Sequence, residues 1–234
     1  MVGFCDLDWI QTSNLLSRNQ MRYSVAPRGL FALANTLEYY AVCGCKYRNK
    51  CVTCKLIFSK NTIKMNLEQY FRDIQDFPKE GILFKDITPL LLNPKAREEM
   101  LETLVSTLRE KKIDKVVGVE SRGFFFGILL AEKLNVGFIP VRKPNKLPFD
   151  TISASYELEY GQDILEMHID AIQKGEKILI HDDVLATGGT AKAVCELVEK
   201  LGGEIVQCNF LMELSFLSGR EKIKGNEIFA AITY

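Results

Sequence analysis

Two adjacent carboxylates, and the loop of small residues that follows them, form the part of the sequence with the clearest potential for chemistry. The stretch 178–190 reads Ile-Leu-Ile-His-Asp-Asp-Val-Leu-Ala-Thr-Gly-Gly-Thr. Glycines allow backbone N–H groups to turn toward one point, a following helix contributes partial positive charge at its N-terminus, and threonine hydroxyls donate further hydrogen bonds. Such a loop is suited to bind a phosphate.

The carboxylates add a second requirement for the ligand. They cannot attract a phosphate, but they can accept hydrogen bonds from two neighbouring hydroxyl groups. A phosphate beside a diol is the chemistry of a ribose 5-phosphate. The residues that we expect to bind it are Asp182, Asp183, Ala186, Thr187, Gly188, Gly189 and Thr190.

Neither of two familiar nucleotide loops is present in this stretch. The spacing G-x-x-x-x-G-K of the P-loop is absent, and so is the G-x-G-x-x-G of dinucleotide-binding folds. ATPase and dehydrogenase functions are therefore disfavoured.

The elements around this loop alternate between strand-like and helical periods. We expect strands at 115–119, 137–141, 177–181, 205–212 and 228–232, a hairpin formed by 152–159 and 163–169, and helices at 66–73, 94–108, 124–134 and 190–201. Short apolar strands separated by helices predict an α/β fold with a mostly parallel twisted sheet flanked by helices, together with a small hairpin region. Ligands of such sheets bind beyond the carboxyl ends of the strands, which here are the loops after Val119, Val141 and His181. His181 itself is expected to be a packed core histidine.

Composition excludes several other classes of protein. The 234 residues contain 30 Lys and Arg and 30 Asp and Glu, so the net charge is zero, and 47% of the residues are hydrophobic. No apolar run approaches the ~20 residues that span a bilayer. We therefore expect no membrane partner and no chain-wide attraction to nucleic acid.

The chain divides into two parts of different composition. Residues 1–64 carry nine basic and three acidic residues, whereas residues 65–234 carry an excess of six acidic ones. The second part holds only Cys195 and Cys208, both within apolar segments, as expected for a reduced, intracellular domain.

Three interpretations of residues 1–64 remain open. Cys43, Cys45, Cys51 and Cys54 could hold a structural zinc ion, although the first pair is more closely spaced than usual. The basic composition suits a targeting segment, but Asp6 and Asp8 do not. We favour a poorly ordered extension, or upstream sequence before an initiator at Met65, because domain-like patterning begins there.

The acidic pair and its loop resemble the signature of the type I phosphoribosyltransferases, which use 5-phosphoribosyl 1-pyrophosphate (PRPP). Four further segments are similar to the adenine phosphoribosyltransferase family: 77–91, 120–127, 142–148 and 154–161. The resemblance extends over residues 66–234 and covers none of residues 1–64. It implies a cytoplasmic, homodimeric purine-salvage transferase that converts adenine and PRPP to AMP and pyrophosphate. It also implies Mg2+ held mainly through PRPP and water, with no direct protein ligand.

The resemblance also implies roles for individual residues. Pyrophosphate binding falls to Glu120, Ser121, Arg122, Arg142, Lys143 and Lys146, with a cis peptide bond between Glu120 and Ser121. Arginine suits this task because its planar head has several donors.

The resemblance further implies the roles of the residues around the base and its proton, which lie in other segments. Glu159 accepts the proton of adenine, and only the family match separates it from Glu157 on the same strand face. Tyr160 lies in a loop that closes over the substrates. Backbone groups around Leu83 to Lys85 read the purine edge, and Leu214 packs on it.

Two alternatives remain beside this interpretation. A PRPP-binding transcription regulator can have the same fold without turnover, and only the basic, cysteine-bearing extension supports it. Another purine, hypoxanthine or guanine, could replace adenine, and the family motif alone favours adenine.

Overall fold

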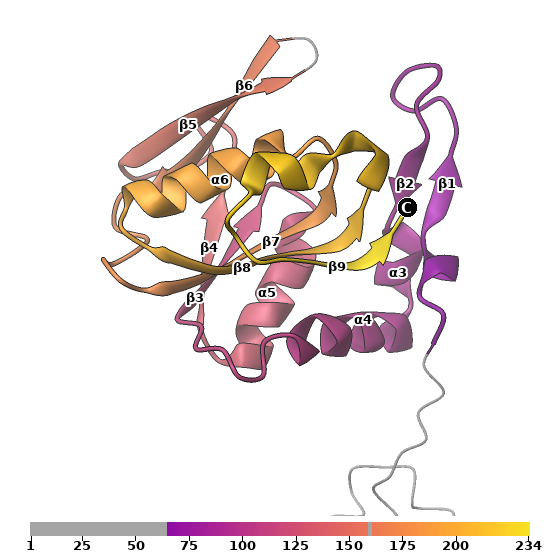
Figure 1. Cartoon of the computed structure of the whole chain (residues 1–234), viewed down its shortest axis with the longest axis horizontal. Helices are drawn as coiled ribbons and strands as arrows, with labels where there is room; N and C mark the ends of the chain where they lie inside the picture. The colour runs from indigo at the N-terminus through magenta and orange to yellow at the C-terminus, as the bar shows by residue number, and fades with distance from the viewer. Residues whose placement is uncertain (1–64, 159–160) are drawn as a thin grey trace, which may run out of the picture. The chain divides into compact units, whose positions relative to one another are not determined.

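The computed structural model describes residues 65–158 and 161–234, and its centre is a parallel sheet of five strands (Figure 1). The strand order is β4-β3-β7-β8-β9. The strands are β3 (Lys115–Val119), β4 (Gly137–Val141), β7 (Lys177–Leu185), β8 (Glu204–Glu213) and β9 (Ile228–Thr233). All neighbouring pairs in this sheet are parallel, so their carboxyl ends share one edge. The predicted fold class is confirmed.

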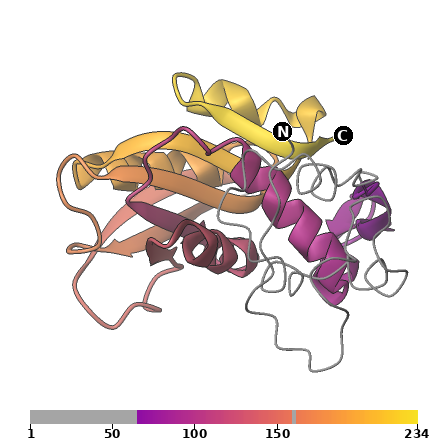
Figure 2. The same ribbon diagram turned by 90° about the horizontal axis from the view of Figure 1, so that it is seen from below.

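Helices cover both faces of the sheet (Figure 2). Helices α4 (Pro94–Ser106) and α5 (Gly123–Leu134) pack on one face, and α6 (Gly189–Lys200) packs on the other. Side chains alternate along strand β7 accordingly: Ile178 and Ile180 belong to the α6 core, whereas Leu179 belongs to the α4–α5 core. The sheet is therefore buried on both sides, which explains why its strands are nearly continuous apolar runs.

Local sequence signals define the helix ends. The Asn93 side chain accepts hydrogen bonds from the N–H groups of Lys95 and Ala96, and Pro94 occupies the first helical position of α4. Helix α5 ends at Asn135, which adopts the left-handed conformation with φ of 56°. The buried face of α4 consists of Ala96, Met100 and Leu104, at the spacing that predicted this helix.

The predicted hairpin is also present. Strand β5 (Thr151–Leu158) pairs antiparallel with β6 (Gly161–His168), and Thr151 lies opposite His168. Ala154, Leu165 and Met167 pack into the α6 core. The hairpin is thereby fixed beside the carboxyl ends of β4 and β7.

The helix predicted for residues 66–73 is wrong. Its first part is a single 3-10 turn, η2 (Glu68–Tyr70), and the chain then enters strand β1 (Arg72–Ile74), which pairs antiparallel with β2 (Phe84–Asp86). The Arg72 guanidinium lies 2.6 Å from the Asp86 carboxylate across this pair. A partner strand whose paired residues are 10 to 14 positions away replaces local helical hydrogen bonds, and the periodicity of 66–73 does not reveal that partner.

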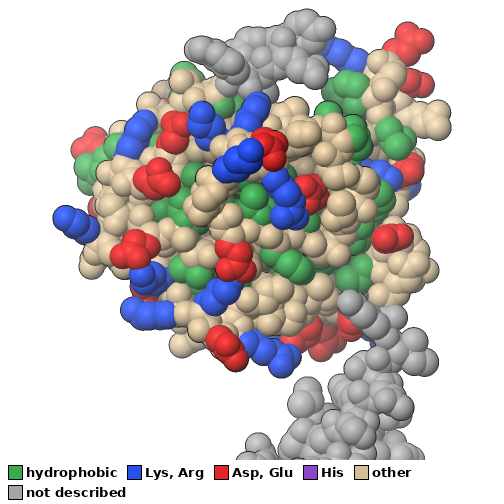
Figure 3. Space-filling model, in the orientation of Figure 1, with side chains coloured by type: hydrophobic (Ala, Val, Ile, Leu, Met, Phe, Trp, Pro, Cys, Tyr) green, Lys and Arg blue, Asp and Glu red, His purple; other side chains and the backbone are tan. Residues whose placement is uncertain are grey.

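The remaining elements connect the sheet to its surface. They are α3 (Thr88–Leu92), η3 (Ser215–Leu217) and η4 (Gly219–Ile223). No helix in the described ranges is both long and apolar enough to cross a membrane. Acidic and basic side chains are interspersed on the face of the described part in Figure 3. The four N-terminal cysteines, and with them the zinc interpretation, lie outside the described residues.

Candidate active site

A cavity of about 340 Å3 lies at the carboxyl ends of β3 and β7. It is lined by residues from three loops and the hairpin: Glu120, Ser121, Arg122, Lys143, Tyr156, Leu165, Asp182, Asp183, Val184, Leu185, Ala186, Thr187, Gly188, Gly189, Thr190 and Ala191. All seven residues predicted to bind phosphate and ribose are among them, as are four of the six predicted to bind pyrophosphate. Parallel strands produce this convergence because their carboxyl ends meet at one edge.

The segment predicted to bind phosphate, residues 186–190 (the phosphate loop), connects β7 to the start of α6 and lines the cavity. Gly188 has φ of 77°, and Gly189 begins α6, whose backbone N–H groups at this end have no partners within the helix. Gly188 and Gly189 are buried, whereas Thr187 is exposed. The helix N-terminus and its turn therefore offer N–H donors and partial positive charge to an anion.

The two acids lie within strand β7 rather than after it, because β7 continues to Leu185. Nε of Arg122 lies 2.5 Å from Oδ2 of Asp183, which is only 3% exposed. Oδ1 of Asp182 accepts a hydrogen bond from the N–H of Asp183 at 2.9 Å. Burial of the Asp182 carboxyl, followed by the neighbouring Asp183 carboxylate, raises its pKa well above the usual range. The pair thus combines a carboxylate that is ion-paired with Arg122 and a second carboxyl that holds its proton more tightly than usual.

The Glu120 carboxylate binds two of the predicted basic residues, Arg142 and Lys143. Its carboxylate accepts hydrogen bonds from the Arg142 guanidinium at 3.2 Å and from the N–H of Lys143 at 2.8 Å. Burial would raise the pKa of Glu120, but these two donors outweigh it and lower the pKa. The peptide bond between Glu120 and Ser121 is cis, as the resemblance implied.

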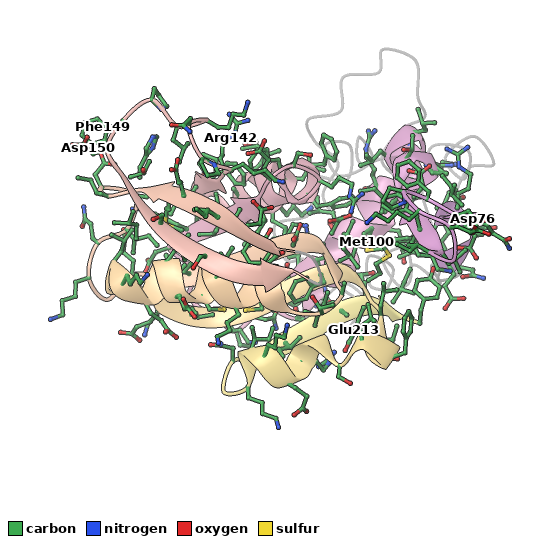
Figure 4. All side chains as sticks on the ribbon, turned by 90° about the horizontal axis from the view of Figure 1, so that it is seen from above. Asp76, Met100, Arg142, Phe149, Asp150 and Glu213 are labelled. Atoms are coloured by element: carbon green, nitrogen blue, oxygen red, sulfur yellow. The ribbon has the colours of Figure 1, made fainter. Side chains whose placement is uncertain are left out.

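Arg142 and Lys146, predicted to contact pyrophosphate, do not line this cavity. The Arg142 guanidinium contacts Glu120 and also donates to the carbonyl of Lys146 at 3.3 Å (Arg142 is labelled in Figure 4). Arg142 therefore contacts the lining residue Glu120, and Lys146 contacts Arg142, so neither residue borders the cavity itself.

Tyr156 and Asp163 were not singled out from the sequence. The Tyr156 hydroxyl donates to Oδ2 of Asp163 at 3.1 Å, and Nζ of Lys143 lies 3.0 Å from the same oxygen. The hydrogen bond and charge of Asp163 raise the pKa of Lys143, which therefore stays cationic beside the cavity. The only sequence signal for Asp163 was its position on the hairpin strand, since its partners come from other segments.

The segments predicted to contact the base adjoin the cavity without lining it. The Arg122 guanidinium carbon lies 4.9 Å from the ring centroid of Phe84, the residue between Leu83 and Lys85. Nζ of Lys85 lies 2.7 Å from Asp73 and 3.8 Å from the Tyr234 ring centroid, so this cation is engaged away from the cavity. Leu214 donates its N–H to the carbonyl of Leu185, a lining residue, at 2.9 Å.

The remaining residues discussed from the sequence are Glu159, Tyr160 and His181. Glu159 and Tyr160 lie outside the described residues. His181 is a core residue, as expected: it is fully buried, its Nδ1 lies 2.7 Å from Oδ1 of Asn209, and burial lowers its pKa to about 4.

The chemistry of the lining residues is compatible with Mg2+ that is held by a substrate. In the described ranges, no three His, Cys, Asp or Glu side chains cluster in a way that could hold a metal ion. Asp182 and Asp183 bring two carboxylates to the cavity, but Asp183 is already paired with Arg122. Mg2+ retains several waters and prefers phosphate oxygens, so these residues suit an ion that is held by a phosphate-bearing substrate.

A parallel α/β sheet with an acidic pair, an anion-binding loop and cationic residues at neighbouring strand ends defines a type I phosphoribosyltransferase. The phosphoribosyl transferase domain family matches residues 90–227. The adenine phosphoribosyltransferase of Flavobacterium johnsoniae is 77% identical over 170 residues, which cover 73% of this chain and 100% of that protein. This chain therefore belongs to the adenine phosphoribosyltransferase family.

Solved structures support the same conclusion. The adenine phosphoribosyltransferase of Thermoanaerobacter pseudethanolicus has a TM-score of 0.71 and 50% identity, covering 72% of this chain and 98% of that chain. The enzyme of Saccharomyces cerevisiae, in complex with adenine and an imino-altritol bisphosphate, has a TM-score of 0.67 and 45% identity, covering 70% and 95%.

Proposed function

We propose that the chain transfers the 5-phosphoribosyl group of PRPP to adenine, forming AMP and pyrophosphate, through the cavity at the carboxyl ends of β3 and β7. Membership of the adenine phosphoribosyltransferase family supports the reaction. The observation that carries the assignment of the site is the Arg122–Asp183 pair. It joins a residue proposed to bind pyrophosphate to a residue proposed to bind ribose, within one cavity that includes the N-terminus of α6.

Each part of PRPP has a matching group of residues. The 5-phosphate would bind the N–H groups and hydroxyls of residues 186–190, and the ribose hydroxyls would donate to Asp182 and Asp183. Pyrophosphate would bind Arg122, Lys143 and the backbone beside Ser121, with Glu120, Arg142 and Lys146 holding these groups in position. Charge-assisted hydrogen bonds to the departing oxygens are strongest in the transition state, when negative charge builds up on them.

The proton balance of the reaction requires a base near adenine. A ring nitrogen of adenine forms the bond to C1 of the ribose, and the electrons of the broken C1–O bond leave with pyrophosphate. The proton on the attacking nitrogen passes to a carboxylate, which we assign to Glu159 by the family match. Such a base typically contributes roughly 10² to 10⁴ in rate. Tyr160 would help the same loop exclude water.

Adenine is the base that the family match supports. The solved yeast relative contains adenine, and in this chain Phe84 and Leu214 contact the lining residues Arg122 and Leu185. Because the Lys85 cation is engaged with Asp73, the backbone of this segment is left to read the amino edge of the purine.

Mg2+ is proposed as the cofactor, bound to the oxygens of PRPP and to water. When bound, it neutralises pyrophosphate charge. The protein's own contribution is to orient PRPP with Arg122, Lys143 and the phosphate loop.

We also propose a cytoplasmic homodimer. Phe125 and Ile128 on α5 are 47% and 52% exposed, which gives this helix an apolar outer face suited to a second copy. Cys195 and Cys208 are free thiols, which is compatible with a reducing compartment. Light scattering of Phe125→Glu against the wild type tests the dimer.

A direct assay tests the reaction and separates it from a PRPP-binding regulator. The chain is incubated with PRPP, Mg2+ and adenine, and AMP is measured. We expect AMP formation that excess hypoxanthine or guanine inhibits only weakly. PRPP-dependent retention of DNA without AMP formation would contradict the enzyme.

A further inference from the structure

The phosphate loop rests against a second backbone segment, the start of η4. A Cβ atom at Gly188 would overlap the carbonyl oxygen of Gly219. In turn, a Cβ atom at Gly219 would overlap the carbonyl oxygen of Ala186 and lie 3.0 Å from the Gly188 nitrogen. Ala186 and Gly188 line the cavity, whereas Gly219 does not. Gly219 therefore supports the loop from outside the cavity, in a space that admits no side chain.

An ion pair fixes the residue that follows Gly219. Nε of Arg220 lies 2.7 and 2.8 Å from the two carboxylate oxygens of Glu213, and Nη2 lies 2.6 Å from Oε2. Glu213 is the last residue of β8 and is only 4% exposed (labelled beside the C-terminal segments in Figure 4). Multiple donors from one guanidinium to one buried carboxylate allow little freedom to either side chain.

Backbone hydrogen bonds connect Glu213 and the residue after it to the ends of the two neighbouring strands, β9 and β7. Its carbonyl accepts the N–H of Tyr234 at 2.9 Å, and the next residue, Leu214, donates to Leu185 at the end of β7 at the same distance. Nη1 of Arg220 also donates to the carbonyl of Ile228 at 3.4 Å. The ion pair therefore connects the rigid ends of β7, β8 and β9 to the segment behind the phosphate loop.

We propose that Arg220, through its ion pair with Glu213, is a positioning residue that holds Gly219 against the phosphate loop and thereby sets the affinity for the 5-phosphate of PRPP and AMP. The inference rests on the proposed function, because it assumes that this loop binds that phosphate. Without the ion pair, the start of η4 can move away from Gly188, and the N–H groups of the loop lose their common direction. Pyrophosphate is bound elsewhere in the cavity, so its affinity does not depend on this contact.

Three variants test the inference. Gly219→Ala displaces the loop without removing a charge. Glu213→Gln combined with Arg220→Met removes the ion pair without leaving a buried carboxylate unpaired. Arg220→Lys keeps the charge but not the planar head. Glu102→Gln and Gly137→Ala are the matched controls, since Glu102 pairs with Lys133 on the surface and a Cβ at Gly137 would only touch Lys115 at 3.4 Å.

The measurements are KM for PRPP, kcat, melting temperature, and the Kd of AMP and of pyrophosphate by calorimetry. Gly219→Ala and the double variant are expected to raise KM for PRPP and Kd for AMP by roughly tenfold, with kcat and the Kd of pyrophosphate within about twofold. Arg220→Lys is expected to be intermediate, and both controls are expected to match the wild type.

Two results would overturn the inference. One is a folded double variant with unchanged affinity for AMP, and the other is an equal loss for AMP and pyrophosphate, which would indicate general destabilisation. If the double variant does not fold, unchanged AMP affinity in Gly219→Ala overturns it instead. A wild-type chain that neither binds nor forms AMP would refute the proposed function itself, which distinguishes the two failures.

Discussion

Arg122 and Asp183, 61 residues apart in the sequence, form an ion pair with 2.5 Å between Nε and Oδ2 that joins the start of α5 to strand β7. Arg122 precedes α5 and Asp183 lies near the end of β7, so the pair spans the carboxyl ends of two adjacent strands. The same carboxylate that would bind a ribose hydroxyl thereby orients the guanidinium that would bind pyrophosphate. Changes to either residue should affect both halves of PRPP.

The first prediction concerns the acidic pair. Replacing both Asp182 and Asp183 with Asn removes the two carboxyl groups proposed to bind the ribose hydroxyls and breaks the ion pair with Arg122. Hydrogen bonds to charged groups contribute about 1.5 to 3 kcal/mol each, so kcat/KM for PRPP should fall by at least roughly 10²-fold. Steady-state kinetics with Glu102→Gln as the control measures this. Retention of wild-type kcat/KM would show that the acids do not bind PRPP.

The second prediction concerns the proton acceptor. Glu159→Gln should lower kcat by roughly 10² to 10⁴ while leaving the Kd of PRPP close to that of the wild type, because the carboxylate acts on adenine. Glu157→Gln is the matched control, since it is the same residue type two positions earlier in the sequence. If Glu157→Gln is the slow variant and Glu159→Gln is not, the base has been assigned to the wrong carboxylate.

The third prediction concerns the pH dependence of stability through His181. Its pKa is about 4 in the folded chain, against 6.5 for an exposed histidine, because burial disfavours the charged form. The unfolded chain therefore binds more protons between these values. The stabilisation is complete above pH 6.5 and is lost as the pH falls toward 4, by about 3 kcal/mol in total.

Urea unfolding at several pH values checks this prediction. The free energy of unfolding of His181→Gln should depend less steeply on pH between 6.5 and 4 than that of the wild type. The same measurement on His168→Gln separates the contribution of the other histidine in the chain. Identical slopes for His181→Gln and the wild type would refute the prediction.

The fourth prediction concerns residues 1–64. The match to the Flavobacterium johnsoniae enzyme covers 170 residues, the length of the segment 65–234, and includes the whole of that protein. A chain that begins at Met65 should therefore fold and retain the kcat and KM of the full chain. A truncated chain that is insoluble or inactive would show that the extension contributes to the domain.

Much of the fold could be predicted from hydrophobic periodicity. Ala96, Met100 and Leu104 recur at helical spacing because they line one buried face, and residues 115–119 and 177–181 are apolar because both faces of the sheet are covered. The helix expected at 66–73 was wrong because Arg72 pairs with Asp86, a partner that local sequence does not identify.

The candidate site was predictable where its residues are contiguous. The segment from Asp182 to Thr190 is continuous in the sequence, and all of its predicted residues line the cavity. The Lys143–Asp163 and Glu213–Arg220 pairs join residues of different elements, so only the packed structure brings them together. The exclusion of Arg142 from the cavity has the same origin, since its partner Glu120 follows another strand.

The most direct measurement is a crystal structure of the chain with bound AMP. We predict that the 5-phosphate accepts hydrogen bonds from the backbone N–H groups between Thr187 and Thr190, with the ribose hydroxyls next to Asp182 and Asp183. A phosphate bound elsewhere, with the loop between β7 and α6 empty, would contradict it.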